Sequence, residues 1–423
     1  MFQDAGDDQQ LIARVAALDI GKAEVTWCVR VPDPKREGGR LQQVGTCSTM
    51  ARALMHLADR LTGWGVTRVV MESTSDYWKP PFYLLEAAGL ETWVVNARDV
   101  KHLPGRPKTD KLDAVWLCKL AERDMLRPCF VPPAPIRVLR DLTRYRADLT
   151  VQVTAEKQRV EKLLEDAQIK LSVVASDIFG VSGRAMLDAL VAGQRDPVVL
   201  ANLARARMRA KLSDLREAFD GARFGDHHAF LLSTMLDRIN ALQGDITRIE
   251  DRIEAQIAPF ADAVARLDTI PGVGPTAAWN IVAEIGVDMT RFPTADHLVS
   301  WAGFAPLVKE SAGRKKGKNA TGHGNSYLAR TLGQAVLGTA KTDTFLAERY
   351  RRLARRRGKK KAIVAVGRSI LVAVWHILSD PTATFIDLGP DFYDTHRGTQ
   401  RAIRHHLRRL NELGVKITLD PAA

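Results

Sequence analysis

The order of apolar segments in the N-terminal part of the chain constrains its fold more than any other feature. Apolar runs bounded by Gly and Pro turns predict strands over residues 15–22, 24–31, 41–47, 66–72 and 91–95. Apolar residues at helical spacing predict helices over residues 49–61 and 77–88 and a third that opens at Asp110. The first three strands follow one another as in hairpins, and the later strands alternate with helices.

This order is that of a ribonuclease-H-like mixed sheet, so we expect an α/β domain at the N-terminus. Its central strand carries Asp19, and a later strand ends in Glu72. In open α/β sheets, ligands bind at the carboxyl ends of the strands. Both acids are therefore predicted to lie at the edge where a site would form.

Two further acids open the third predicted helix. Asp110 and Asp113 are three residues apart and share one face of it, and residues 114–121 are apolar except for Lys119. Such a helix is buried on most of its circumference, and an unpaired buried carboxylate is costly. A bound divalent cation would explain the pair, and so would the positive N-terminal end of the helix dipole. Taken alone, the pair favours the dipole explanation.

Considered together, four acids favour a metal site. Asp19, Glu72, Asp110 and Asp113 supply hard oxygen ligands, which suit Mg²⁺ or Mn²⁺. Two such ions about 4 Å apart hold the attacking and leaving oxygens of a phosphodiester. No acid stands two residues after Asp19, which speaks against the proofreading-exonuclease arrangement. The spacing favours a resolvase-like arrangement, which ends in two acids three residues apart.

Charge and cysteine content narrow the class of protein. The 423-residue chain has a net charge of +13 and a pI near 9.7, which favours nucleic acid over a membrane surface as its partner. Its four cysteines form no CxxC pair, so we expect a reducing cytosol and neither a zinc site nor a disulfide framework. No export leader is visible in the sequence. The apolar run from Ala362 to Leu378 predicts a core helix and not a membrane span.

A proline-rich segment, residues 128–135, predicts a domain boundary, and two heptad patterns follow it. The first consists of Val153, Val160, Ala167 and Val174, supported by Leu164 and Leu171. The second consists of Leu232, Ile239, Ile246 and Ile253, with Met235, Leu242 and Ile249 in the companion seam and Pro259 after its end. It predicts a long helix that pairs either within the chain, as an antiparallel hairpin, or between two chains. Irregular helices with a basic run at 205–211 are expected between the two patterns.

A third region begins with the pattern Ile270-Pro-Gly-Val-Gly274. Gly272 and Gly274 stand between two predicted helices, so that backbone N–H groups at the start of the second helix can bind a phosphate. The pattern resembles a helix-hairpin-helix, and the alternative is a plain Gly-Pro turn. The basic character of the chain favours phosphate binding.

Positive charge is concentrated between Arg314 and Lys361. This segment holds 15 Lys or Arg and two acids, a difference of +13 that equals the net charge of the whole chain. It predicts a nucleic-acid surface, with contacts expected from Lys309, Arg314, Lys315, Lys316, Lys318 and Arg330. Ser311 lies just before four of these cations. From chemistry alone it is a loop serine that hydrogen-bonds a phosphate, because a serine hydroxyl is a poor nucleophile until it is activated.

Seven short motifs occur in an order that resembles the DEDD transposases of the insertion sequence 110 family. They are Leu18-Asp19-Ile-Gly-Lys22, Met71-Glu72-Ser-Thr74, Lys108-Thr-Asp110-Lys-Leu-Asp113-Ala114, Ile270-Pro-Gly-Val-Gly274, Trp301-Ala-Gly-Phe-Ala-Pro306, Glu310-Ser311 and Gly324-Asn-Ser-Tyr-Leu-Ala-Arg330. The resemblance implies a RuvC-like N-terminal domain, a coiled-coil connector and a mostly helical C-terminal transposase domain. Their expected bounds are residues 13–130, 136–262 and 263–390.

The resemblance also implies the roles of the site residues. The expected metal ligands are Asp19, Glu72, Asp110 and Asp113. Ser311 is the expected nucleophile, although Ala312 departs from the Gly or Ser that is common after it. Ser300 and Ser326 are alternatives that lack its cationic surroundings. The family further implies a structured bridge RNA that pairs with donor and target DNA, and a homodimer that assembles to a tetramer in which Ser311 of one subunit meets the acids of another.

The sequence therefore predicts a cytoplasmic, nucleoid-associated enzyme that cuts and rejoins DNA strands under RNA guidance. One alternative is a metal-dependent, structure-specific endonuclease that resembles a Holliday-junction resolvase, in which activated water attacks and Ser311 only binds. A second alternative is a nucleic-acid-binding protein without activity. The presence of all four acids weighs against the second alternative.

Overall fold

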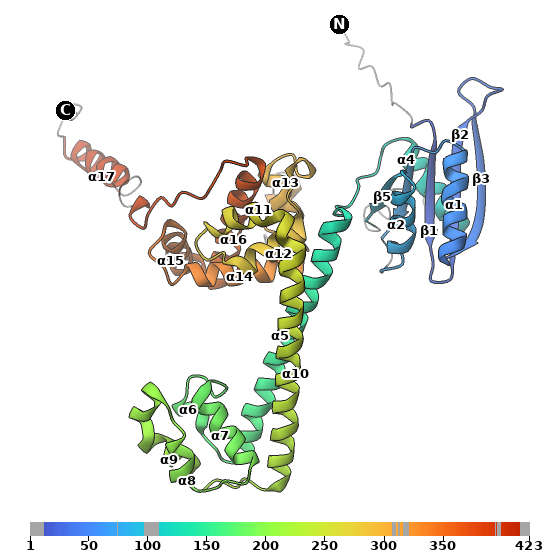
Figure 1. The fold of residues 1–423 in the computed structure, drawn as a ribbon. Helices are drawn as coiled ribbons and strands as arrows, with labels where there is room; N and C mark the ends of the chain where they lie inside the picture. The colour runs from blue at the N-terminus through green and yellow to red at the C-terminus, as the bar shows by residue number, and fades with distance from the viewer. Residues whose placement is uncertain are drawn as a thin grey trace. The chain divides into compact units, whose positions relative to one another are not determined.

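The structure is a computed structural model, and it describes residues 12–73, 75–96, 110–306, 310–311, 314–315, 321–393, 395 and 399–414. The chain divides into two compact units, residues 1–131 and residues 132–423. Figure 1 colours the chain from its N-terminus to its C-terminus, with the first unit in blue to teal. The two units carry different parts of the predicted chemistry, and each is described in turn.

The N-terminal unit is built on a five-stranded mixed sheet of order β3-β2-β1-β4-β5. Its strands are β1 (Val15–Ile20), β2 (Glu24–Pro32), β3 (Arg40–Ser48), β4 (Arg68–Glu72) and β5 (Glu91–Val95). The first three strands pair antiparallel, while β4 and β5 add in parallel. This arrangement confirms the predicted α/β domain and is compatible with a ribonuclease-H-like fold.

Among the described residues of this unit, three helices cover the two faces of the sheet: α1 (Ala51–Gly63), α2 (Lys79–Ala87) and α4 (Asp110–Glu122). Leu18 and Met71 belong to the core on the α1 and α2 side. Val15, Ala17 and Val70 belong to the core on the α4 side. Because successive strand residues point to opposite faces, these two core sets fix the face to which every other residue of β1 and β4 points.

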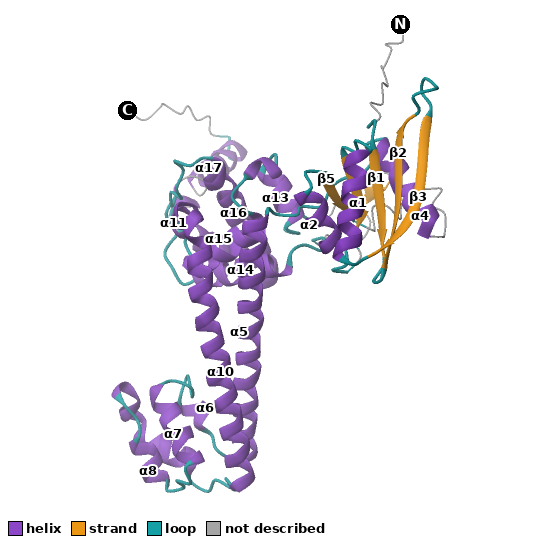
Figure 2. Cartoon of the chain, turned by 45° about the vertical axis from the view of Figure 1, so that its right-hand side comes forward, coloured by secondary structure: helices purple, strands orange, loops and turns teal. Residues whose placement is uncertain are grey.

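Two long helices form the axis of the second unit, and Figures 1 and 2 show them side by side: α5 (Ala134–Asp166) and α10 (Asp226–Ile257). An ion pair joins Arg146 to Glu250 near one end, and a hydrogen bond joins His228 to Asp166 at the other, so the helices run antiparallel. The second heptad pattern lies along α10, where Leu232, Ile239 and Ile253 are buried. This seam packs on α5 of the same chain.

The first heptad pattern does not form one continuous helix, because α5 ends at Asp166. Gln168 has a φ of +62°, a left-handed conformation that stops the helix, and Val174 lies in a separate short helix. The chain there turns into a small bundle whose core is continuous with the α5–α10 seam. Its helices are α6 (Leu171–Val174), α7 (Val181–Val191), α8 (Pro197–Asn202), η1 (Ala206–Lys211) and α9 (Leu212–Phe219).

A second helical bundle follows α10. Its helices are η2 (Ala258–Phe260), α11 (Ala261–Asp268), α12 (Pro275–Ile285), η3 (Met289–Arg291), α13 (Ala295–Trp301), α14 (Ser326–Thr339), α15 (Phe345–Arg357) and α16 (Lys359–Ser379). Two short strands, β6 (Glu310–Ser311) and β7 (Arg314–Lys315), pair antiparallel between α13 and α14, and α17 (Thr399–Glu412) follows towards the C-terminus.

The helix α16 is the central element of this bundle. Within the described part of the chain it is the one helix that is long and apolar enough, by composition, to cross a membrane. Val366, Ile370 and Val374 are nevertheless fully buried, and Trp375 Nε1 donates a 2.8 Å hydrogen bond to the carbonyl of Phe292. Its apolar residues therefore pack against the other helices, as expected of a core helix.

Candidate active site and nucleic-acid groove

Two of the predicted metal ligands lie next to each other on the sheet. In the parallel pairing of β1 and β4, Leu18 is the partner of Met71, so the following residues Asp19 and Glu72 are neighbours. Strand alternation points both side chains to the same face as Ala17 and Val70, which is the face covered by α4. Both acids are half-buried at the carboxyl ends of their strands.

The direction of α4 brings its first turn to the same edge. Cys118 Sγ lies 3.6 Å from the carbonyl oxygen of Val15, and the Glu122 carbonyl accepts a 2.8 Å hydrogen bond from Ile12 N–H. The C-terminal part of α4 therefore lies at the start of β1, and the helix runs antiparallel to that strand. At about 1.5 Å per helical residue and 3.3 Å per strand residue, the first turn of α4 reaches the level of Asp19.

The acids of α4 lie in this first turn. Asp113 is half-buried, and Asp110 is the first residue of the helix, while its side chain lies outside the described part of the structure. The elements β1, β4 and α4 thus bring the sequence positions of the four predicted ligands to one edge of the sheet. Carboxylates gathered in this way are the donor set that Mg²⁺ and Mn²⁺ prefer.

Sequence reasoning missed Thr26, a polar residue at the same place. Thr26 on β2 is the direct cross-strand partner of Asp19, and only 8% of it is exposed. It shares its face with Cys28, which packs in the core under α4. A buried hydroxyl beside a carboxylate can orient it through a hydrogen bond. Only the pairing register reveals this neighbour, because Thr26 lies seven positions after Asp19 in the sequence.

Beneath the acids, the α4 side of the sheet contains a pair of thiols. A hydrogen bond between the two side chains lowers the pKa of Cys28 and, together with burial, raises the pKa of Cys118 well above its usual value. At the far end of α4, Glu122 pairs with Arg30 and Arg40.

The predicted nucleophile lies in the second unit. Ser311 is paired with Arg314 and Glu310 with Lys315, and Pro306 and Thr321 form an isolated antiparallel bridge further from the tip. We call the segment from Pro306 to Thr321 the serine hairpin. Of the predicted contacts, Lys309, Lys316 and Lys318 lie outside the described residues. The same holds for the side chains of Ser311, Arg314 and Lys315.

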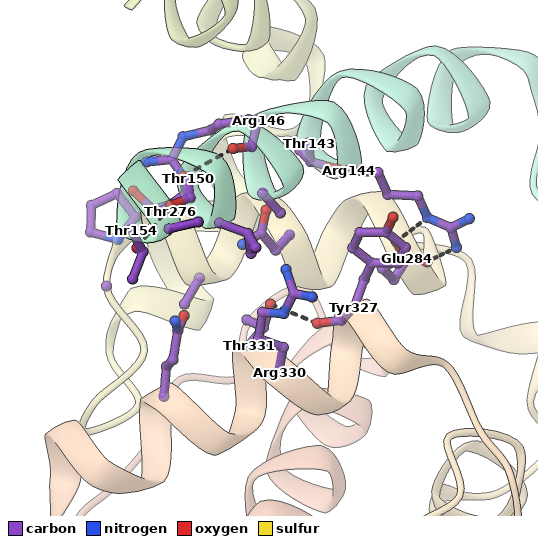
Figure 3. Close-up of a pocket in the computed structure, with 18 of the residues that line it drawn as sticks. Thr143, Arg144, Arg146, Thr150, Thr154, Thr276, Glu284, Tyr327, Arg330 and Thr331 are labelled. Atoms are coloured by element: carbon purple, nitrogen blue, oxygen red, sulfur yellow. Dashed lines mark hydrogen bonds and ion pairs between the residues drawn. The ribbon is translucent and has the colours of Figure 1, made fainter. Parts of the chain in front are cut away.

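A groove of about 600 Å³ lies between α5, α12 and α14. Figure 3 shows its walls, with Thr143, Arg146 and Thr150 on α5, Thr276 on α12, and Arg330 and Thr331 on α14. Gly274 and Arg330, two of the predicted nucleic-acid contacts, both line it. Among the described residues Arg330 makes no ion pair, and its guanidinium lies 5.7 Å from the ring centroid of Tyr327.

The start of α12 gives one end of this groove an anion-binding character. Gly274 is the N-cap residue and Pro275 follows it, so no side chain in the described structure caps the helix. The N–H groups of Thr276 and Ala277, which both line the groove, lie in the first turn, where a helix leaves its donors without intrahelical partners. Uncapped donors at the positive end of a helix dipole suit a phosphate.

Gly272 has a different role from Gly274. Its φ is +85°, and a Cβ atom there would lie 2.2 Å from the carbonyl oxygen of Ala335 and 2.2 Å from Thr339 Oγ1. Glycine is required because the turn between α11 and α12 packs directly on the backbone of α14. Gly274, by contrast, has nothing within 4 Å of such an atom and faces open space.

A second cluster with metal-binding potential lies where α5 ends and α10 begins. Ligand atoms of Asp166, His227 and His228 lie within 4.8 Å of one another. His228 Nδ1, however, accepts a 3.1 Å hydrogen bond from Gly225 N–H, and its Nε2 lies 3.1 Å from Asp166 Oδ2. Both ring nitrogens are thus engaged in fixing the start of α10, so this cluster is accounted for without an ion.

The densest positive charge in the described structure lies where α15 meets α16. The residues are Arg355, Arg356, Arg357, Lys359, Lys360 and Lys361, and all are exposed. Gly358, with a φ of +83°, joins the two helices and presents these side chains around one corner. Such a cluster neutralises several phosphates of a bound nucleic acid.

Comparison with known proteins covers both units. Residues 16–169 match the family of DEDD transposases of IS110 type, and residues 264–351 match the "Transposase IS116/IS110/IS902 family". The chain is 25% identical over 343 residues to the IS110 43.6 kDa protein of Streptomyces coelicolor. This alignment covers 75% of this chain and 83% of that protein. It is 27% identical over 398 residues to the IS900 42 kDa protein of Mycobacterium paratuberculosis, with 86% and 95% covered. A putative transposase of Sinorhizobium fredii is 26% identical over 317 residues, with 69% and 72% covered.

Proposed function

The chain belongs to the IS110 family of DEDD transposases, and from this premise we propose that it cuts and rejoins DNA strands through a seryl–DNA intermediate under the guidance of a bridge RNA. As an insertion-sequence transposase it acts on DNA. The observation that best supports the proposed chemistry is the convergence of Asp19, Glu72 and the first turn of α4 on one edge of the sheet.

The proposed metal ligands are Asp19, Glu72, Asp110 and Asp113. A cluster of carboxylates at one edge would repel itself without a cation, which favours a divalent ion such as Mg²⁺ or Mn²⁺ at this place. When bound, the metal would stabilise negative charge on the oxygens of the phosphodiester. Thr26 would hold the Asp19 carboxylate in one orientation.

We assign the nucleophile to Ser311. Its hydroxyl would lose its proton as the oxygen attacks the phosphorus, the bond from phosphorus to one deoxyribose oxygen would break, and that oxygen would take up a proton and leave as a hydroxyl. The reverse attack by a hydroxyl on another strand would release the serine and join the strands. Such an ester conserves the phosphodiester energy, so rejoining needs no external energy source. Arg314 and Lys315, which follow Ser311 closely, would draw the phosphate group towards it.

Nucleic-acid binding is assigned to three features of the second unit. The turn from α11 to α12 would act as a helix-hairpin-helix that binds a phosphate at Gly274, and Arg330 would contact the same strand from the other wall of the groove. The cations after Ser311 would contact DNA near the reacting phosphate. The exposed cluster from Arg355 to Lys361 would bind the bridge RNA or the DNA ends.

Assembly is the remaining part of the proposal. The helices α5 and α10 would act as an antiparallel coiled-coil connector within each chain, supported by the buried seam at Ile239 and Ile253. The active assembly would be a homodimer that pairs to a tetramer, in which Ser311 of one subunit meets the acids of another. The protein would work in the cytoplasm at the nucleoid, where its DNA is.

The decisive test is the covalent intermediate. The protein is incubated with Mg²⁺, bridge RNA and end-labelled DNA, and a denaturing gel with and without protease reveals DNA attached to protein. We expect an adduct in the unchanged protein and none in Ser311→Ala, which should still bind RNA and DNA. Ser300→Ala and Ser326→Ala are matched controls and should keep the adduct.

The same gel distinguishes the serine mechanism from the alternative in which water attacks. If DNA is cut and no protein becomes attached, water is the nucleophile, and the protein is a structure-specific endonuclease like a junction resolvase. An adduct that persists in Ser311→Ala would remove this residue from the mechanism.

A further inference from the structure

The serine hairpin returns to the helical bundle next to a buried carboxylate. Glu284 on α12 is only 1% exposed, and it stands among apolar residues of the bundle core. A buried carboxylate is stable only when charged partners and hydrogen-bond donors surround it. The partners of Glu284 come from two different elements, and one of these is the start of α14, the first helix after the serine hairpin.

The first partners of Glu284 lie on α5. Arg144 donates two parallel hydrogen bonds to its carboxylate, of 2.7 Å from Nε and 2.8 Å from Nη2, as Figure 3 shows. Arg140 Nε lies 3.3 Å from Glu284 Oε2 and also donates a 3.1 Å hydrogen bond to the carbonyl of Ala283. The bidentate geometry fixes the plane of the carboxylate as well as its position.

The other partner is Asn325. Its amide Nδ2 donates a hydrogen bond to Glu284 Oε2, while its Oδ1 accepts hydrogen bonds of 3.0 Å from Tyr327 N–H and 3.1 Å from Leu328 N–H. Asn325 is therefore the N-cap of α14 and is held by Glu284 at the same time. It lies four positions after Thr321, the last residue of the serine hairpin.

The two chain ends of the hairpin are also locked to each other. A Cβ atom on Gly324 would lie 2.1 Å from the carbonyl oxygen of Ala302, and one on Gly303 would lie 2.9 Å from the Cα of Gly324. Only glycine allows this approach, and the Pro306–Thr321 bridge lies just beyond it. Whatever fixes Asn325 therefore fixes both ends of the hairpin.

We propose that Glu284 and Asn325 are positioning residues that hold the base of the serine hairpin against the connector helix α5, so that Ser311 is presented at a defined place. This inference rests on the proposed role of Ser311. A second link supports it, because Tyr327 in the first turn of α14 donates its hydroxyl hydrogen bond to Asp148 of α5 at 3.1 Å. Burial and this hydrogen bond raise the pKa of Tyr327.

Asn325→Asp separates positioning from capping. Aspartate caps a helix as well as asparagine does, so α14 keeps its N-cap. The new aspartate carboxylate, however, has no N–H group to donate to Glu284, and its negative charge repels that of Glu284. The double variant Glu284→Gln with Asn325→Asp again has one amide and one carboxylate in contact. The amide now stands at position 284 and the carboxylate at position 325, so a hydrogen bond between them can form again. Thr344→Asp is the matched control, because Thr344 is the N-cap of the next helix, α15, and does not contact Glu284.

Two measurements are made on each full-length variant. Hydrogen–deuterium exchange of residues 302–306 and 321–325 reports on the anchor without any catalytic step. The rate of seryl–DNA adduct formation, compared with the affinity for RNA and DNA, reports on how the anchor affects the positioning of Ser311. In Asn325→Asp we expect exchange at least about tenfold faster and an adduct rate about 100-fold lower, since a displacement of 1 Å near a reacting group costs about that much. Nucleic-acid affinity should stay within about twofold, and the double variant should recover at least about tenfold of the lost adduct rate.

The outcomes separate the inference from the proposed function. Unchanged exchange in Asn325→Asp overturns the anchor, and faster exchange with an unchanged adduct rate overturns its role in positioning. A parallel loss of adduct and nucleic-acid affinity that the double variant does not relieve would mean a merely structural role, and would also overturn the inference. If the unchanged protein forms no adduct, the assignment of Ser311 fails, while exchange still decides whether Glu284 and Asn325 anchor the hairpin.

Discussion

At the scale of single residues, strand alternation decides which side chains share a face. Asp19 and Glu72 are 53 positions apart, yet the parallel register makes them neighbours and points both towards α4. Thr26 joins them from β2. A change of charge in this group should therefore affect the proposed metal site and leave the apolar cores on both faces of the sheet untouched.

Asp113→Asn tests the proposed metal site. The change keeps the volume of the side chain and removes a charged ligand, so we expect strand cleavage to fall at least about 100-fold while the melting temperature changes little. The measurement is cleavage across a Mg²⁺ titration and in the presence of chelator. Asp59→Asn on the exposed face of α1 is the control and should retain activity. Full cleavage by the unchanged protein in chelator would contradict the metal site.

Gly272→Ala tests the turn between α11 and α12. The left-handed φ and the contact with Ala335 and Thr339 should destabilise the fold by about 2–5 kcal/mol, from backbone strain and overpacking together. Gly274→Ala has an ordinary φ of −86° and open space, and should cost only about 1 kcal/mol as a weaker N-cap. Thermal unfolding measures both, and equal losses would contradict the packing role of Gly272.

At the scale of elements, α10 shows how a heptad pattern is used. Its spacing predicts a long helix with an apolar seam, and both are found. Packing within the chain covers the seam at Ile239 and leaves Ile246 only partly buried. The sequence could not choose between a partner helix in the same chain and one in another, because the seam residues are the same in either case.

Ile239→Asp tests this seam. Burying an unpaired carboxylate costs several kcal/mol, which is comparable to the stability of a small domain, so we expect the bundle of α6–α9 to unfold. Gln243→Asp places the same charge on the exposed side of the same helix and should leave the unfolding transition nearly unchanged. Circular dichroism and limited proteolysis measure the effect. A folded Ile239→Asp protein would show that the seam is not a core.

At the scale of the whole molecule, the exposed cluster of positive charge and the predicted acidic ligands belong to different units of the chain. The N-terminal unit holds the carboxylate edge, while the exposed cluster from Arg355 to Lys361 lies in the second unit. A polyanion bound to this cluster releases counterions, so its affinity should fall steeply with salt.

Replacing Arg355, Arg356 and Arg357 by Ala should lower the slope of log affinity against log salt concentration by about 1 for each lost phosphate contact. The measurement is a salt titration with structured RNA and with duplex DNA. The control variant replaces Arg207, Arg209 and Lys211 by Ala. These residues are exposed in the bundle of α6–α9, so the variant removes the same amount of charge at another place. An identical change of slope in both triple variants would mean that net charge, and not this cluster, determines the salt dependence.

Much of this protein follows from local patterns in its sequence. The alternation of strands and helices predicted the mixed sheet, and the apolar period predicted α10, because both reflect the burial of neighbouring residues. The motifs carried the family resemblance. The end of α5 escaped this reasoning, since the heptad continues in sequence past Gln168 while the backbone there turns left-handed.

Tertiary structure alone decided which distant residues meet. The placement of Thr26 beside Asp19 depends on strand register, and the meeting of Glu284 with Asn325 and Arg144 depends on the packing of three helices. Gly272 and Gly274 look equivalent in the sequence, yet one packs against α14 and the other opens to the groove. Such relations have no local signal, because each partner looks like an ordinary polar residue or glycine until the chain is folded.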